Sequence, residues 1–226
     1  MKGANTSGSP NDAVLSVETS IAYIVDDDEL LRRSLGSLLR SVGLRVESFA
    51  SSREFLEFKP PNVPSCLVLD VRLRGESGLA FQEEAVRSGV SIPILFMTGY
   101  GDVQMTVRAM KRGAVNFLTK PYHDQDMVDA VTEALHVDAK RLETERELAA
   151  LRAAYDLLSG REREVMAFVI AGLMNKQIAA ALNIHEVTVK VHRGQVMRKM
   201  KAGSVPDLVR KAEALGIKPH DAPVSG

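Results

Sequence analysis

Short apolar runs alternate with amphipathic stretches from residue 20 to residue 136 of the chain. The apolar runs predict strands at 20–25, 44–49, 65–70, 92–98 and 114–119. Between and after them, apolar residues at helical spacing predict helices at 29–43, 51–58, 78–89, 102–113 and 124–136. Five strand–helix units in this order predict an α/β domain with a five-stranded parallel sheet.

The stretch 137–158 is rich in Ala, Leu, Glu and Arg and contains no Gly or Pro, so we expect a helical linker. Leu148, Leu151, Tyr155 and Leu158 follow one another at spacings of three and four residues, the pattern of a coiled-coil seam. The seam covers only about two heptads, which leaves open whether two linkers pair.

A second, all-α domain is expected at 159–218. Ser159 and Glu162 have the spacing of a capping box, and Gly172 is placed to end the helix that they begin. A short helix at 175–183, a tight turn at 184–186 and a basic helix at 187–200 follow. This order is typical of a helix-turn-helix domain, in which the last of these helices enters the major groove of DNA.

Composition supports two domains with cores of their own. The chain has 226 residues, of which 45% are hydrophobic and 26% charged. No apolar run approaches the roughly 20 residues of a membrane span or has the form of a signal peptide, so we expect a cytoplasmic protein without a membrane partner. The single cysteine, Cys66, lies within an apolar run and permits no internal disulfide, which fits a reducing compartment. We expect a disordered tail at 1–19 and a flexible one at 219–226.

Charge is divided unequally between the two domains, although the formal net charge is zero. Residues 20–136 contain 13 Lys and Arg against 16 Asp and Glu, a balance of −3. Residues 159–218 contain 11 against 5, a balance of +6. The second domain is therefore the one expected to meet a polyanion.

Polar side chains follow four of the five predicted strands. In an open parallel sheet, ligands bind at the carboxyl ends of the strands. Several carboxylates at one rim would repel one another unless they shared a cation, and Mg²⁺ suits such oxygen ligands. A phosphoryl group could then be accepted by a carboxylate nucleophile at residue 70 and held by a hydroxyl and an ammonium group. The residues at these ends are Asp26, Asp27, Asp28, Asp70, Thr98 and Lys120.

Each of these residues also has an ordinary structural interpretation. A run of Asp that opens a helix commonly caps it and interacts with the helix dipole. A Thr after a strand is commonly a turn residue, and a Lys before Pro is commonly exposed. The chemical interpretation rests on their coincidence at the ends of strands of one sheet.

Residues 20–136 resemble the receiver domains of two-component response regulators, which have a flavodoxin-like fold. The matching motifs are VDDDELLR, LVLDVRLRGESG, FMTGYGDV and FLTKPY, and MTGYGDV with AMKRGAVNFLTKP is most similar to the FixJ-type branch. The resemblance implies that Asp26, Asp27 and the backbone carbonyl of Arg72 bind Mg²⁺ together with Asp70, the phosphoacceptor. It further implies that Thr98 and Lys120 contact the phosphoryl group and that Phe117 changes rotamer on activation.

Two features of this region concern single positions. Arg74 stands where family members usually carry Pro, and the sequence does not decide whether this speeds or slows dephosphorylation. The resemblance also implies a cis peptide bond between Lys120 and Pro121, although only about 5% of such bonds are cis in general.

Residues 156–218 resemble the LuxR-type DNA-binding domain, through LSGREREV, NKQIAAALNI and TVKVH. On the basic helix, Val189, Val196 and Met200 recur on one face as core. The resemblance implies phosphate contacts by Lys176 and Thr188, base contacts by Lys190 and Val191, and pairing of helix 204–216 in the bound dimer. Further DNA-binding candidates are Arg193, Gln195 and Arg198. Gly194 departs from relatives with a longer side chain and either lets the backbone approach DNA closely or loosens specificity.

Together these features predict a phosphorylation-controlled transcription factor. A sensor histidine kinase would donate the phosphoryl group, and double-stranded DNA, RNA polymerase and a second copy of the chain would be the other partners. Val107 and Met110 are the candidates for the dimer contact. The alternatives are a phosphotransfer or phosphatase-like enzyme that uses Asp70 and a DNA-binding protein that works without phosphorylation. Release of a masked DNA-binding domain is the alternative to dimerisation.

Overall fold

A computed structural model describes residues 20–73, 76–99 and 103–220 of the chain. The chain forms two compact units that divide between Leu142 and Glu143. Arg74 and the expected tail 1–19 lie outside the described residues, as do 221–226.

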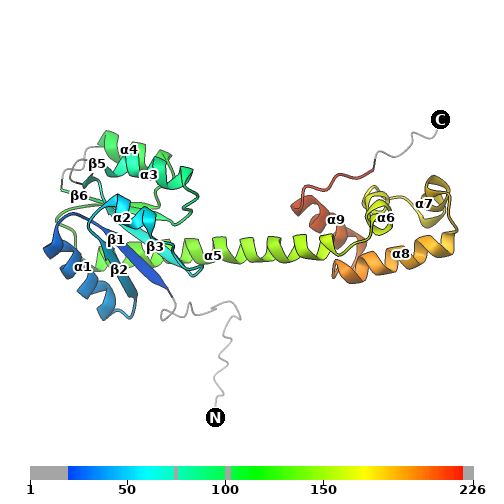
Figure 1. The fold of residues 1–226 in the computed structure, drawn as a ribbon, viewed down its shortest axis with the longest axis horizontal. Coiled ribbons are helices and arrows are strands. Elements are labelled where there is room, and N and C mark those ends of the chain that lie inside the picture. The colour runs from blue at the N-terminus through cyan, green and yellow to red at the C-terminus, as the bar shows by residue number, and fades with distance from the viewer. Residues whose placement is uncertain (1–19, 74–75, 100–102, 221–226) are drawn as a thin grey trace, which may run out of the picture. The chain divides into compact units, whose positions relative to one another are not determined.

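The first unit contains the predicted five-stranded parallel sheet (Figure 1). The strands run side by side in the order β2-β1-β3-β6-β7, which places β3 at the centre. Their observed bounds lie within the predicted ranges: β1 Ile21–Val25, β2 Arg45–Phe49, β3 Ser65–Asp70, β6 Ile94–Thr98 and β7 Asn116–Thr119. The predicted α/β fold is therefore confirmed.

Helices cover both faces of this sheet because the strands carry apolar side chains on both faces. Helices α1, Glu29–Ser41, and α5, Asp124–Asp156, pack on the face that carries Ile24 and Val68. The opposite face carries Tyr23 and Leu67 and is covered by three shorter helices, α2 Ser52–Glu57, α3 Gly78–Arg87 and α4 Val103–Lys111. Cys66 is fully buried in the core, as expected.

A small antiparallel hairpin, which the sequence pattern did not predict, follows the central strand. It pairs β4, Arg72–Leu73, with β5, Glu76–Ser77. Strands of two residues are too short to produce an alternating pattern in the sequence, so hydrophobic periodicity cannot reveal them.

Helix α5 joins two segments that the sequence treats separately, the helix 124–136 and the linker 137–158. Its contact with the sheet continues past residue 136, because the buried Asp138 bonds to the backbone of Ser65. The Asp138 carboxylate accepts a hydrogen bond from the backbone N–H of Ser65 at 2.8 Å and pairs with Arg141 at 2.8 Å. A buried carboxylate with two partners thus fixes α5 to the start of β3.

Four helices make up the rest of the second unit: α6 Gly160–Ile170, α7 Asn175–Leu182, α8 Glu186–Lys199 and α9 Val205–Ala214. The predicted capping box is present, because Ser159 Oγ accepts from the Glu162 N–H and Glu162 Oε2 accepts from the Ser159 N–H at 2.6 Å. Gly172 follows α6 with φ of 85°, a conformation that glycine adopts readily. The helix-turn-helix order is therefore the one that the sequence predicts.

The core of the second unit also takes up most of the predicted coiled-coil seam. Leu158 is buried in this core, and Leu151 and Tyr155 pack against it. Leu148 is the one seam residue that is exposed. His220, assigned from the sequence to a flexible tail, stacks on Phe168 with ring centroids 4.3 Å apart.

The longest helix is not a membrane span. Within the described residues, no helix combines the length and the apolar character needed to cross a bilayer.

Candidate functional site

The carboxyl ends of the parallel strands bring the predicted polar residues to one edge of the sheet. Asp70 is the last residue of β3 and Thr98 the last of β6, while Asp26 directly follows β1 and Lys120 directly follows β7. The register pairs Val25 with Leu69, Asp70 with Met97, and Thr98 with Thr119, so these ends lie at similar heights. Side chains far apart in the chain therefore meet at one rim.

Lys120 connects the two buried carboxylates of this rim. Its Nζ lies 2.6 Å from Asp70 Oδ2 and 3.1 Å from Asp26 Oδ2. Burial raises the pKa of the Asp26 carboxyl, against the opposing effect of the Asp28 N–H and Lys120. Burial acts to lower the pKa of Lys120, but the hydrogen bond to Asp70 and the nearby negative charges raise it overall. The ammonium group thus balances charge that the protein interior solvates poorly.

The second oxygen of Asp70 is held by backbone. Asp70 Oδ1 accepts a hydrogen bond from the Arg72 N–H at 2.9 Å. The helix α3 begins next to this loop at Gly78, whose N–H donates to the Val71 carbonyl at 2.8 Å. A Cβ at Gly78 would lie only 2.5 Å from the Asp70 carbonyl oxygen, so a larger residue would displace the backbone of Asp70. Sequence reasoning missed Gly78, although a glycine at a helix start just after a candidate nucleophile is a usable signal.

The three consecutive aspartates have different surroundings. Asp26 is buried and its Oδ1 accepts from the Asp28 N–H at 2.8 Å. Asp28 is exposed and caps α1 by accepting from the N–H groups of Leu30 at 2.8 Å and Leu31 at 3.3 Å. Asp27 is half-buried between them. The capping interpretation of the run is therefore confirmed for Asp28, whereas Asp26 is turned into the buried rim beside Lys120.

Among the described residues, no group of three or more His, Cys, Asp and Glu side chains is arranged to hold a metal ion. Asp26 and Asp70 nevertheless share a cation, the Lys120 ammonium.

The two predicted switch residues lie on neighbouring strands. Thr98 is fully buried, and its carbonyl accepts from the Lys120 N–H at 2.7 Å. Phe117, in β7, is half-buried, and its ring centroid lies 6.4 Å from that of Phe96. The Lys120–Pro121 bond is cis, as predicted. The dimer candidates of α4, Val107 and Met110, are both exposed.

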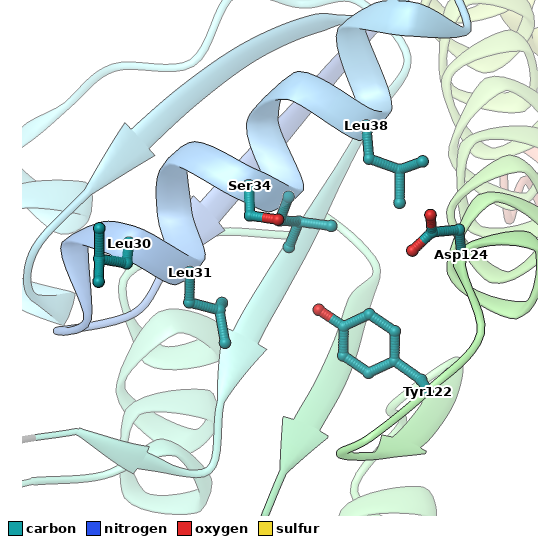
Figure 2. Close-up of a pocket in the computed structure, with 7 residues that line it drawn as sticks. Leu30, Leu31, Ser34, Leu38, Tyr122 and Asp124 are labelled. Carbon is teal, nitrogen blue, oxygen red and sulfur yellow. The ribbon is translucent and has the colours of Figure 1, made fainter.

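A groove of about 560 Å³ with both apolar and polar lining lies between α1 and the segment that follows Lys120. Figure 2 shows leucines along one side of α1, with Tyr122 and Asp124 across from them. Burial raises the pKa of the Tyr122 hydroxyl. Leu30, at the start of α1, is 77% exposed. A groove with an exposed leucine at its edge therefore adjoins the carboxylate rim.

In the second unit, α8 presents the predicted DNA-binding side chains. Its core face consists of the fully buried Val189 and Val196. Thr188, Lys190, Val191 and Arg198 are exposed, and so is Lys176 in the second position of α7. Three candidates have partners within the unit: Arg193 Nη1 donates to Asn175 Oδ1 at 3.0 Å, and Arg198 donates to Gln195 Oε1. The Arg193–Asn175 bond links α8 to the start of α7, which its sequence position alone did not indicate.

A partly buried ion pair holds the C-terminal end of α8. Lys199 Nζ lies 2.6 Å from Glu162 Oε2 and donates to the Leu157 carbonyl at 3.1 Å. The hydrogen bond from Lys199 and that from the Ser159 N–H lower the pKa of Glu162. The capping box of α6 and the end of α8 therefore share one carboxylate.

Comparisons with known proteins agree with both halves of the chain. Residues 22–132 match the response regulator receiver domain, and residues 156–212 match the bacterial regulatory proteins of the luxR family. Nodulation protein W of Bradyrhizobium diazoefficiens is 54% identical over 198 residues, which cover 88% of this chain and 87% of that protein. The chain belongs to the response regulators. It is a phosphorylation-controlled transcriptional regulator that binds DNA, and not a classical enzyme.

Other relatives place this response regulator in the FixJ-like group. The transcriptional regulatory protein FixJ of Azorhizobium caulinodans is 41% identical over 204 residues, covering 90% of this chain and 97% of that protein. The solved structure of the response regulator StyR is 44% identical, with a TM-score of 0.78, and the match covers 86% of this chain and 98% of that chain.

Proposed function

We propose that Asp70 accepts a phosphoryl group from a sensor histidine kinase and that this modification controls DNA binding by the second unit. The observation that carries the proposal is the position of Lys120 Nζ, 2.6 Å from Asp70 and 3.1 Å from Asp26. A carboxylate nucleophile at the rim of a parallel sheet, beside an ammonium group and a buried hydroxyl, has the groups that phosphoryl transfer needs.

We infer that Mg²⁺ binds to the carboxylates of Asp26, Asp27 and Asp70 and to the Arg72 carbonyl. Mg²⁺ commonly takes one or two protein carboxylates and keeps several waters, so a rim with two buried carboxylates fits it. The Lys120 ammonium stands in for a cation between Asp26 and Asp70. Bound Mg²⁺ would supply positive charge that neutralises the incoming phosphoryl oxygens.

The residues of the chain then carry the transfer itself. An Asp70 oxygen attacks the phosphorus of a phosphohistidine, the new P–O bond forms, and the imidazole leaves with the electron pair of the broken P–N bond. Lys120 and the Thr98 hydroxyl hold phosphoryl oxygens. Attack of water on the aspartyl phosphate returns Asp70 and releases phosphate, so the receiver also catalyses its own dephosphorylation.

The kinase is expected to cover the groove beside this rim. A protein that brings its phosphohistidine to Asp70 must cover the surface around it, which includes the start of α1. Leu30 offers apolar area there, at 77% exposure, and Tyr122 lines the same groove two residues after Lys120 (Figure 2). The specificity of phosphorylation by the kinase would depend on this surface.

Phosphorylation is proposed to favour dimerisation through α4 and β7. Movement of Thr98 toward the phosphoryl group would let Phe117 turn inward and change the neighbouring surface, where Val107 and Met110 are 44% and 45% exposed. Two copies would then bind two half-sites. RNA polymerase would be the next partner, and the protein would act in the cytoplasm, where promoter DNA is.

The exposed positions of α7 and α8 support a set of proposed contacts to DNA. Lys176 and Thr188 are proposed to contact phosphates, and Lys190 and Val191 base edges. Arg193, Gln195 and Arg198 would complete the surface, and contact by Arg193 would require exchange of its bond to Asn175.

Phosphodonor labelling tests the assignment of Asp70. With Mg²⁺ and a small-molecule phosphodonor, the full chain should gain one acid-labile phosphoryl group, and Asp70→Asn should abolish it. Asp28→Asn is the matched control, because Asn also caps helices and Asp28 lies at the same rim. Full labelling of Asp70→Asn would overturn the assignment. Release of phosphate from an added phosphate ester over many turnovers would instead favour the phosphatase-like alternative.

A further inference from the structure

The side of α8 that faces away from the core carries an unusual set of residues for a basic helix. At about 100° per residue, Val187, Val191 and Arg198 lie within about 20° of the direction opposite the buried Val189. Val187 is 73% exposed and Val191 56% exposed. Gly194 lies on the same side, between Val191 and Arg198. The strip Val187–Val191–Gly194 is therefore apolar and faces away from the core of the second unit.

Nothing within the second unit explains this strip. A glycine inside a helix costs about 1 kcal/mol relative to alanine, and it is commonly retained where a side chain would clash. A Cβ at Gly194 would meet no atom within 4 Å, so packing does not require the glycine. Both valines likewise leave most of their surface in water, although β-branched residues are weak helix formers. We therefore attribute the two exposed valines and the glycine to contact with a partner outside the unit.

The surroundings of the strip indicate DNA as that partner. Lys190 and Arg198 flank it and are exposed, and Thr188 and Lys176 lie on the neighbouring surface. Apolar side chains on a helix in the major groove contact the C5-methyl group of thymine, which is the one apolar feature that the groove presents. A glycine lets the helix backbone come closer to the base edges than any other residue would.

Building on the proposed DNA contacts, we propose that Val187, Val191 and Gly194 form a surface that reads thymine methyl groups. Val187 is the new specificity residue, since the first turn of α8 places it one turn before Val191. The two valines would contact methyl groups of neighbouring base pairs, and Gly194 would set the depth of the helix in the groove. The operator half-site should therefore contain thymines where α8 enters.

Replacement of thymine by deoxyuridine tests this proposal directly, because deoxyuridine lacks only the C5-methyl group. Full-length protein, treated with Mg²⁺ and a small-molecule phosphodonor, is first used to select its site from random duplexes. Its affinity is then measured for the selected duplex and for duplexes with single thymines replaced. Wild-type protein should lose about four-fold in affinity for each methyl group that it contacts, the equivalent of about 0.8 kcal/mol for one buried methyl-sized group.

Variants assign the contact to a residue. Val187→Ser should weaken binding to the selected duplex, and binding by this variant should no longer respond to deoxyuridine at one thymine position. The matched control is Val86→Ser, at an exposed valine of α3, and this variant should keep the full response to deoxyuridine. Gly194→Ala should weaken binding about ten-fold, the effect of one mismatched base pair, without loss of helical content. Specific binding that is insensitive to deoxyuridine would overturn the proposed thymine contacts but not the proposed DNA-binding function. Failure to select any sequence would overturn both the thymine contacts and the DNA-binding function, and would favour a protein partner for the strip.

Discussion

Removal of the Lys120 charge should destabilise the receiver unit and make its folding depend on Mg²⁺. Lys120→Met keeps most of the side-chain volume but leaves the carboxylates of Asp26 and Asp70 without the ammonium that now lies 3.1 Å and 2.6 Å from them. Breaking a buried ion pair from one side costs about 3–5 kcal/mol. We expect a loss of about 3 kcal/mol, at the lower end, because the Lys120 side chain is 22% exposed and water can partly replace it.

Mg²⁺ should recover much of this loss. A ligand at 100 times its dissociation constant stabilises the folded state by about 2.7 kcal/mol. In the wild type, Mg²⁺ must compete with the Lys120 ammonium for the same two carboxylates, whereas in the variant it meets them unpaired. Mg²⁺ should therefore stabilise Lys120→Met more than it stabilises the wild type.

Hydrogen exchange of the β1 and β3 amides in increasing urea measures this effect in the receiver unit alone. Lys59→Met is a suitable control, because Lys59 is exposed in the loop between α2 and β3. A loss below about 1 kcal/mol, or a loss that Mg²⁺ does not reduce, would refute the view that Lys120 balances the charge of Asp26 and Asp70.

Four further changes test separate parts of the molecule. Glu162→Gln should lower the free energy of unfolding by about 1 kcal/mol at pH 7. In urea titrations the difference should begin to shrink near pH 4.5, the ordinary glutamate pKa, and should vanish only below the lowered pKa of Glu162 in the folded protein. Lys176→Ala should weaken binding to all duplexes and reduce the salt slope by about one unit in titrations. Val107→Asp should block the phosphorylation-dependent dimer in sedimentation without preventing labelling. Leu30→Asp should slow phosphorylation by the kinase but not by a small phosphodonor.

Much of the rim could be predicted because a parallel sheet converts sequence order into spatial proximity. Asp70, Thr98 and Lys120 end or directly follow strands whose apolar runs are plain in the sequence, and parallel register then brings those ends together. The capping box of Ser159 and Glu162 was equally accessible, since both partners lie within one helical turn. Local spacing and strand order are enough for such features.

The features that were missed depend on contacts between segments distant in the sequence. Nothing near Asp138 indicates that it bonds the backbone of Ser65, 73 residues away, so the linker was expected to leave the receiver too early. Gly78 is required by the Asp70 carbonyl, and Arg193 is oriented by Asn175 across the helix-turn-helix. Leu151 and Tyr155 fit a coiled-coil spacing equally well whether their partner is another copy or the core of their own unit.

The apolar strip of α8 also bears on why a phosphorylation switch is needed at all. Methyl contacts of about 0.8 kcal/mol each, beside one or two cations, distinguish sequences but supply little affinity to a single copy. Two copies on adjacent half-sites double the number of such contacts and turn the second binding event into an intramolecular one. To move an equilibrium from about 1:99 to 99:1, phosphorylation must favour the active state by about 5.5 kcal/mol. A receiver that controls pairing would reach this effect because only paired copies gain the second half-site, and weak binding by a single α8 would then keep the unphosphorylated protein off its operator.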